Sequence, residues 1–267
     1  MKDWNDHWSE YKYDGLRASK NPKEWADVSW FTSLAILSYE IDKFLDRTKI
    51  DPCDIKFLEV GCGTAVVSRY VLEKYKFNVY AIDSSETAVS NIKDEAIGVN
   101  LSVGDLIKLN FDNGFFHIIY SGGVLEYISD LDSAFKELHR VIDINGIVLA
   151  NIVPRIFNLQ IFGDIFFGLR SLGNSRNPSR MVPNAASTKR PIEYSIFYKK
   201  YFGSSRIIYY LPFPEFPSPR IIRRIYGRII YKLALLIVRF IPKYFNLNSY
   251  LSISALFVLS IKNTDDV

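Results

Sequence analysis

Two glycines in this chain have the spacing that holds a charged small molecule against the main chain. Gly61 and Gly63 flank one residue directly after an apolar run, 57–60, and a helical pattern begins at Val66. Glycine adopts backbone angles that other residues resist, and it lets a ligand touch the main chain. Free N–H groups at the start of a helix attract a carboxylate or a phosphate. The pattern therefore predicts a strand, a tight turn and a helix that bind an anionic group.

An acid lies near the end of each of the first three predicted strands. Glu59 precedes the glycine turn by two residues. Asp83 ends the second strand-like run, and Asp105 follows the third, 99–103. Taken singly, such an acid is often a helix N-cap or a turn residue. Ligands of open α/β sheets bind at the carboxyl ends of the strands, so the order of these acids favours one shared ligand.

This order of pieces resembles the class I S-adenosylmethionine-dependent methyltransferases of the type 11 and 12 kind. Residues 57–65 read Phe-Leu-Glu-Val-Gly-Cys-Gly-Thr-Ala and fit that family's pattern of an acid followed by Gly-x-Gly. A dinucleotide fingerprint needs a third glycine where Val66 stands. The resemblance covers roughly residues 55–153 in five ordered pieces. It implies the fold and the cofactor, and it leaves the substrate open.

The resemblance implies S-adenosylmethionine as the cofactor and assigns to it eight residues at or just after the strand ends. In chain order these are Glu59, Gly61, Gly63, Asp83, Ser84, Asp105, Leu106 and Ser121. The first three would hold the methionine end. Asp83 would hold the ribose, with Ser84 next to it, and the following pair would hold the adenine. The main chain at Ser121 would lie below the sulfonium.

No catalytic base follows from the sequence. Many relatives have a histidine after the Leu-Glu of the motif that follows the fourth strand, and Tyr127 stands there in this chain. A tyrosine with its ordinary pKa is a poor base at neutral pH. Glu126 and Tyr127 are therefore weak candidates, and a histidine-based O-methylation is in doubt. No metal site is expected, because the two cysteines have no metal-ligand spacing.

Alternating strand and helix patterns predict an α/β fold with helices on both faces of a mostly parallel sheet. The resemblance extends this to a seven-stranded Rossmann-like sheet whose antiparallel last strand is inserted between strands five and six. We expect one composite domain. Its parts are an N-terminal helical cap at 1–50, a cofactor-binding core at 51–153, a substrate cap at 154–204, and the last two strands with a basic helical insertion at 205–267.

The N-terminal helices have two interpretations. Helices in this position fold over the cofactor as a lid in related methyltransferases. The aromatic residues of this segment could equally anchor a helix to the edge of the core.

Charge is divided unevenly along the chain. Residues 1–164 hold 17 Lys and Arg against 25 Asp and Glu, whereas residues 165–267 hold 16 against 4. A predicted helix at 220–241 repeats a cation every four residues, at Arg220, Arg224, Arg228 and Lys232. It is too interrupted by charge to span a membrane. Either it lies in an anionic membrane interface, or it docks on the domain or on a second subunit.

The sequence thus predicts a methyltransferase acting on a small or lipid-linked acceptor, such as an anionic glycan, polyprenyl or quinone-type molecule. We expect it in the cytoplasm, free or at the inner face of a membrane, because no signal pattern is present. Nucleic acid is not the expected partner. Two alternatives stay open: an inactive protein of the same fold at a membrane surface, and a nicotinamide-dependent Rossmann reductase.

Overall fold

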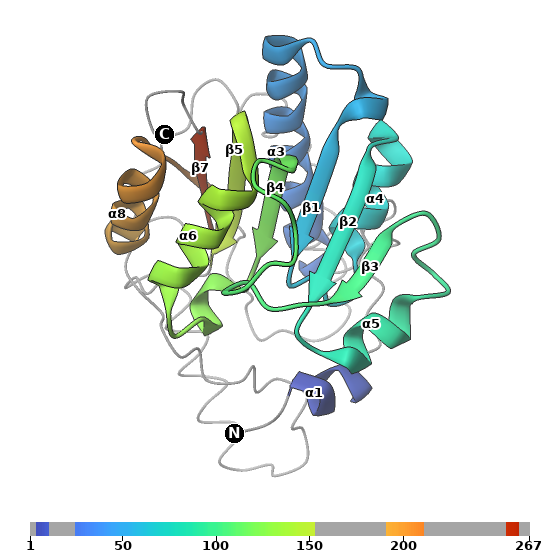
Figure 1. Cartoon of the computed structure of the whole chain (residues 1–267). Coiled ribbons are helices and arrows are strands. Elements are labelled where there is room, and N and C mark those ends of the chain that lie inside the picture. The colour runs from blue at the N-terminus through green and yellow to red at the C-terminus, as the bar shows by residue number, and fades with distance from the viewer. Residues whose placement is uncertain (1–3, 11–24, 153–190, 211–254, 262–267) are drawn as a thin grey trace.

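The apolar runs of the chain form a central sheet whose strands alternate with helices (Figure 1). The structure is a computed structural model and describes residues 4–10, 25–152, 191–210 and 255–261. The strands are β1 (Lys56–Val60), β2 (Asn78–Asp83), β3 (Asn100–Val103), β4 (Phe116–Gly122), β5 (Ile142–Ile152), β6 (Arg206–Tyr210) and β7 (Ala255–Ile261). The α-helices are α1 (Trp4–Glu10), α3 (Trp25–Thr48), α4 (Val66–Tyr75), α5 (Glu86–Ile92), α6 (Leu131–Val141) and α8 (Pro191–Phe202). Two short 3-10 helices are η1 (Pro52–Asp54) and η2 (Leu125–Tyr127).

The strands lie in the order β3-β2-β1-β4-β5-β7-β6. Strands β1 to β5 run parallel to their neighbours, and β7 runs antiparallel to both β5 and β6. The predicted α/β class with a mostly parallel sheet is confirmed. The chain reverses its direction of travel across the sheet between β1 and β4, and ligands of such sheets bind at this switch point, outside the carboxyl ends of the strands.

Strand β5 begins earlier than the sequence predicts. Asn145 and Gly146 indicate a turn, with a strand from Ile147 onward, yet β5 begins at Ile142 directly after α6. Phe116 pairs with Ile142 whereas Ile118 pairs with Ile147, so an irregularity in the register absorbs the additional residues. Asn145 keeps a left-handed φ of 64° inside this irregularity. The turn signal was therefore real, but it marks a distortion within the strand.

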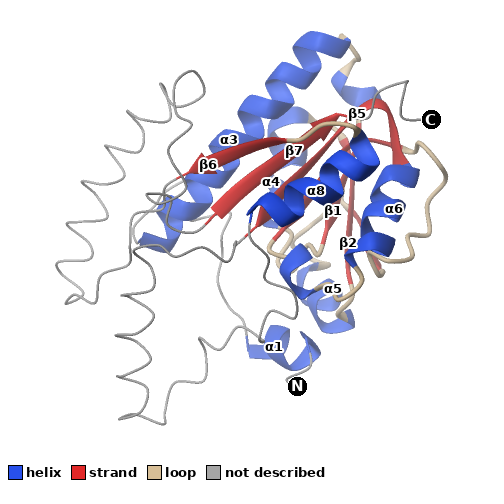
Figure 2. Ribbon diagram, turned by 90° about the vertical axis from the view of Figure 1, so that its left-hand side faces the viewer, coloured by secondary structure: helices blue, strands red, loops and turns tan. Residues whose placement is uncertain are grey.

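Helices cover both faces of the sheet (Figure 2). Side chains of α6 and α8 pack on one face against β1, β4 and β5, in a core that includes Phe116, Phe135 and Tyr198. Side chains of α3 and α4 pack on the other face, where Ile41 and Phe57 are fully buried. The strands are hence apolar on both sides, as parallel sheets require.

Helix α3 belongs to the core rather than to a cap. Its apolar residues from Leu34 to Phe44 are buried against the sheet. The buried carboxylate of Glu40 forms an ion pair with Arg206 of β6, which connects the helix to the outermost strand of the sheet. Ser33 accepts a hydrogen bond from the side chain of Asn151, at 2.9 Å. The anchoring interpretation therefore holds for this helix.

Several predicted parts fall partly or wholly outside the described residues. The basic helix at 220–241 lies wholly outside them, as does most of the substrate cap at 154–204, of which α8 is described. The predicted domain boundaries stay predictions. No helix within the four described segments has the length and apolarity needed to cross a membrane.

Candidate cofactor site

The turn after β1 has a shape that only glycine fits. Gly61 and Gly63 have φ values of 67° and 50°, in the left-handed region that side chains disfavour. A Cβ atom on Gly61 would lie 2.2 Å from Cγ2 of Val124, in the loop after β4. The main chain of Cys62 donates a hydrogen bond to the carbonyl of Ile82 at 2.9 Å. The turn is thus held against the ends of β2 and β4.

Asp83, at the end of β2, ties the glycine turn to the next helix. Its Oδ2 accepts the N–H of Gly63 at 2.8 Å, and its Oδ1 accepts the N–H of Ser85 at 2.9 Å. Its relative exposure is only 6%, and burial raises its pKa, whereas the main-chain donors act in the opposite direction. Ser84 beside it is exposed. A carboxylate has about four lone-pair sites, so these two bonds leave acceptor capacity for a ligand.

Glu59 lies beneath the turn and caps α4. Its Oε2 accepts the N–H of Ser68 at 2.7 Å and the Ser68 hydroxyl at 2.5 Å. Burial raises the pKa of Glu59 to about 8, the Ser68 hydrogen bonds oppose this rise, and the nearby charge of Asp83 adds to it. The N-cap position of α4, Ala65, supplies no side-chain acceptor. Glu59 therefore performs the capping that residue 65 lacks, a role that its sequence position did not reveal.

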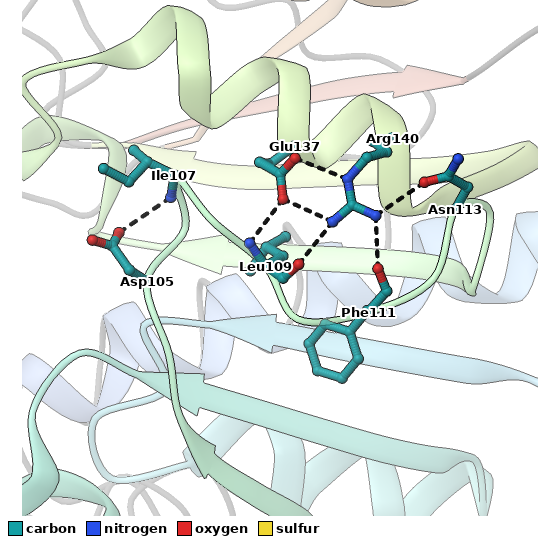
Figure 3. Close-up of polar contacts among 7 residues, drawn as sticks. All are labelled: Asp105, Ile107, Leu109, Phe111, Asn113, Glu137 and Arg140. Carbon is teal, nitrogen blue, oxygen red and sulfur yellow. Dashed lines mark hydrogen bonds and ion pairs between the residues drawn. The ribbon is translucent and has the colours of Figure 1, made fainter.

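Asp105 and Leu106 begin the loop after β3, on the same edge of the sheet. The N–H of Gly104 donates to the carbonyl of Asp83 at 2.9 Å, so the ends of β2 and β3 are joined. The exposed Asp105 carboxylate accepts the N–H of Ile107 at 3.1 Å (Figure 3), and Leu106 is buried. The structure thus places the acids at successive strand ends, with Glu59 and Asp83 inside and Asp105 at the surface.

Comparison with known protein families identifies this stretch. Residues 58–150 match the family described as Methyltransferase domain. The match begins within β1 and ends within β5, so it includes the glycine turn and all three strand-end acids. The chain carries a class I S-adenosylmethionine-dependent methyltransferase domain. This confirms the family that the sequence resembles.

Two curated methyltransferases that this chain resembles are longer than the stretch that matches. Phosphoethanolamine N-methyltransferase 3 of Arabidopsis thaliana is 30% identical over 111 residues, which are 40% of this chain and 22% of the relative. Malonyl-[acyl-carrier protein] O-methyltransferase of Halorhodospira halophila (strain DSM 244 / SL1) is 26% identical over 132 residues, or 46% and 44% of the two chains. The matches thus span less than half the length of either relative.

A solved structure shares the fold over nearly its whole length. Geranyl diphosphate C-methyltransferase from Streptomyces coelicolor A3(2) superposes with a TM-score of 0.55 at 13% identity, covering 98% of each chain. At this identity the likeness concerns the fold alone.

The methyltransferase domain places both of its weak catalytic candidates within η2, after β4. Glu126 is buried, and Tyr127 is half-buried with its pKa raised by burial and by the charge of Glu126. The raised pKa leaves even less of Tyr127 as the tyrosinate that could accept a proton at neutral pH. Ser121, at the end of β4, is buried between Val60 of β1 and Ala150 of β5 in the sheet.

Helix α1 lies beyond the carboxyl ends of the strands, at the site of the methyltransferase domain (Figure 1). The sequence did not reveal this position. Asn5 Oδ1 accepts the N–H of Thr87 at 3.2 Å and contacts the Ser85 hydroxyl at 2.7 Å. The Trp4 ring meets the edge of Tyr127, with centroids 4.9 Å apart. A Cβ atom on Gly63 would lie 2.4 Å from the ring of Trp8. The helix thus spans from η2 to the glycine turn, over the ends of β1, β2 and β4.

Packing of Trp8 on the glycine turn predicts a specific cost for Gly63→Ala. Both the left-handed backbone and the displaced indole should destabilise this variant, by about 2–3 kcal/mol in total. Gly123→Ala is the matched control, because Gly123 has a φ of 67° and no atom within 4 Å of an added Cβ. It should cost about 1 kcal/mol. Urea unfolding of both variants measures the difference, and equal costs would contradict the contact between α1 and the turn.

Among the described residues, no group of three or more His, Cys, Asp or Glu side chains is arranged to hold a metal ion. The free Cys62 is buried in the glycine turn, and Cys53 is exposed at the opposite end of β1. The chemistry of the site thus rests on main-chain groups, carboxylates and aromatic rings.

Proposed function

We propose that this protein transfers a methyl group from S-adenosylmethionine to a small or lipid-linked acceptor. The observation that carries the proposal is the pair of hydrogen bonds that the Asp83 carboxylate accepts. They hold the glycine turn and the start of α5 together at the ends of β1 and β2. The match of residues 58–150 to a methyltransferase family supports it independently.

The residues at the strand ends fit this cofactor. An added Cβ at Gly61 or at Gly63 would collide with Val124 or with Trp8, so this turn can form only as bare main chain. Asp83 would hold the ribose hydroxyls with its remaining lone pairs, and Asp105 would accept the adenine amino group. Leu106 would offer its main chain to the adenine ring, and Ser121 would offer its main chain near the reacting end of the cofactor. Glu59 acts through the turn, by fixing α4.

The bound cofactor supplies an electrophilic methyl group on a positively charged sulfur. What the protein contributes is position, which is worth roughly 7–11 kcal/mol when the reacting atoms are held in line. Helix α1 excludes water from above the turn through Trp4 and Trp8. Burial and the charge of Glu126 raise the pKa of Tyr127, so this tyrosine is not assigned a role as the general base.

The acceptor is an anion in this proposal. The second part of the chain has 16 basic and 4 acidic residues over 165–267, which favours a negatively charged partner. One relative carries a phosphorylated acceptor in its name, phosphoethanolamine. A lipid-linked acceptor would place the protein at an anionic membrane surface from the cytoplasmic side.

Two measurements test the proposal. S-adenosylhomocysteine should raise the melting temperature of the full chain, and NADH should not. Incubation with methyl-labelled S-adenosylmethionine and cell extract should then transfer label to the lipid or small-molecule fraction. Stabilisation by NADH alone would favour the reductase, and cofactor binding without transfer to any fraction would favour an inactive binding protein.

A further inference from the structure

The loop between β3 and β4 is fixed by one arginine of α6. The guanidinium of Arg140 donates from Nη1 to the carbonyl of Phe111 at 2.7 Å and to Oδ1 of Asn113 at 3.0 Å (Figure 3). Its Nη2 donates to the carbonyl of Leu109 at 2.7 Å. The loop residues have no regular strand or helix partners, so this side chain supplies acceptor pairing that the sheet does not.

Glu137, one turn earlier on α6, completes the arrangement. Its carboxylate accepts from Nε and Nη2 of Arg140, both at 2.8 Å, and its Oε2 also accepts the N–H of Leu109 at 2.8 Å. All five N–H donors of the guanidinium thereby have partners. The hydrogen bonds from Arg140 lower the pKa of Glu137, and the same bonds raise the pKa of Arg140. The pair therefore binds both main-chain groups of Leu109, the N–H through Glu137 and the carbonyl through Arg140.

Leu109 is the far end of the turn that begins at Asp105. The N–H of Lys108 donates to the carbonyl of Asp105 at 3.1 Å, and the N–H of Ile107 donates to its carboxylate. Leu106 and Leu109 are both buried in the core under α6. At the near end, Gly104 is bonded to the main chain of Asp83. Asp105 is thus held between two anchors, β2 on one side and the Glu137–Arg140 pair on the other.

We propose that Glu137 and Arg140 are positioning residues for adenine recognition, acting through the turn 105–109 on the Asp105 carboxylate. This inference rests on the proposed function. Neither side chain touches the cofactor. Their effect should therefore fall on the hydrogen bond that Asp105 would make to adenine, and leave the ribose and methionine contacts as they are.

Two ligands separate this role from general support of the fold. One is S-adenosylhomocysteine, and the other is its analogue in which hydrogen replaces the 6-amino group of adenine. Calorimetry with the full chain should show that the wild type binds the first about 10- to 100-fold more tightly, as a hydrogen bond to a charged group predicts. Asp105→Ala should reduce this ratio to nearly one.

Arg140→Ala should reduce the ratio at least fivefold while changing the affinity for the analogue less than threefold. Glu137→Gln keeps an acceptor for the Leu109 N–H but weakens the hydrogen bonds to the guanidinium, so it should also reduce the ratio. It replaces Arg140→Ala in the test if that variant fails to fold. Arg69→Ala is the matched control, because Arg69 of α4 pairs with the exposed Glu95 at 3.0 Å. It should leave both affinities unchanged.

The outcomes distinguish this inference from the function on which it rests. A wild type that binds neither ligand overturns the proposed function. A wild type that binds both ligands equally leaves that function standing and removes the role of Asp105. If the wild type discriminates, and Arg140→Ala or Glu137→Gln weakens both ligands by the same factor, the pair supports the fold alone and the inference is wrong.

Discussion

Asp83→Ala is expected to lower the affinity for S-adenosylmethionine by about 30- to 1,000-fold, or about 2–4 kcal/mol. Two charge-assisted hydrogen bonds to the ribose would be lost with the carboxylate. The same change also removes the acceptor of the Gly63 and Ser85 N–H groups, so the glycine turn loses its attachment to β2. Calorimetric titration at a temperature where circular dichroism shows the variant folded measures the binding effect.

Two further variants separate the contributions of Asp83. Asp83→Asn keeps one acceptor oxygen without the charge and should lose less affinity than the alanine variant. Asp51→Ala is the matched control, since Asp51 also accepts a main-chain N–H, that of Cys53, at the opposite end of β1. It should bind as the wild type does. Unchanged affinity in Asp83→Ala would refute the ribose contact.

Glu59 should make the protein less stable as pH rises toward 8. Burial raises its pKa in the folded protein to about 8, against 4.5 in the unfolded chain. Between these values the folded state retains a proton that the unfolded state has lost, so rising pH favours unfolding. The contribution of Glu59 is complete below pH 4.5 and is lost as pH approaches 8. Its full extent is on the order of 5 kcal/mol.

The variant Glu59→Gln should flatten this dependence. An amide keeps an acceptor for Ser68 and has no proton to lose, so the variant should gain stability relative to the wild type as pH rises from 5.5 to 8.5. Urea midpoints at several pH values measure the gain. Glu73→Gln, at an exposed position of α4, should keep the wild-type profile. Parallel profiles for wild type and Glu59→Gln would show that the buried carboxyl does not titrate in this range.

The sequence was sufficient to predict the strands and helices, but not the side-chain hydrogen bonds that connect them. Periodicity and turn residues place β1 and the end of β2 to within a residue, because buried strands leave a local pattern. The partners of Asp83 and Glu59 were missed, since a carboxylate that ties two loops looks in sequence like any strand-end acid. Arg140 likewise ends an amphipathic helix in the sequence, and three of its five hydrogen bonds depend on a loop about 30 residues earlier.

Helix α1 is the clearest case of information that the sequence lacks. Its aromatic residues are compatible with a lid and with an anchor, and local pattern does not say which surface they meet. The contacts of Trp4 and Trp8 cross more than 50 residues of chain. Only the packed structure separates α1, which lies over the strand ends, from α3, which lies in the core.

The place of β7 has a consequence for biosynthesis. Residues 255–261 lie between β5 and β6, so both of these strands have an open edge until β7 has been made. Unpaired strand edges are templates for aggregation. During translation the edges of β5 and β6 that face β7 therefore stay unpaired while some 45 residues, from Tyr210 to Ala255, are made. A reporter fused after residue 250 should accumulate in inclusion bodies, whereas one fused after residue 262 should stay in the supernatant.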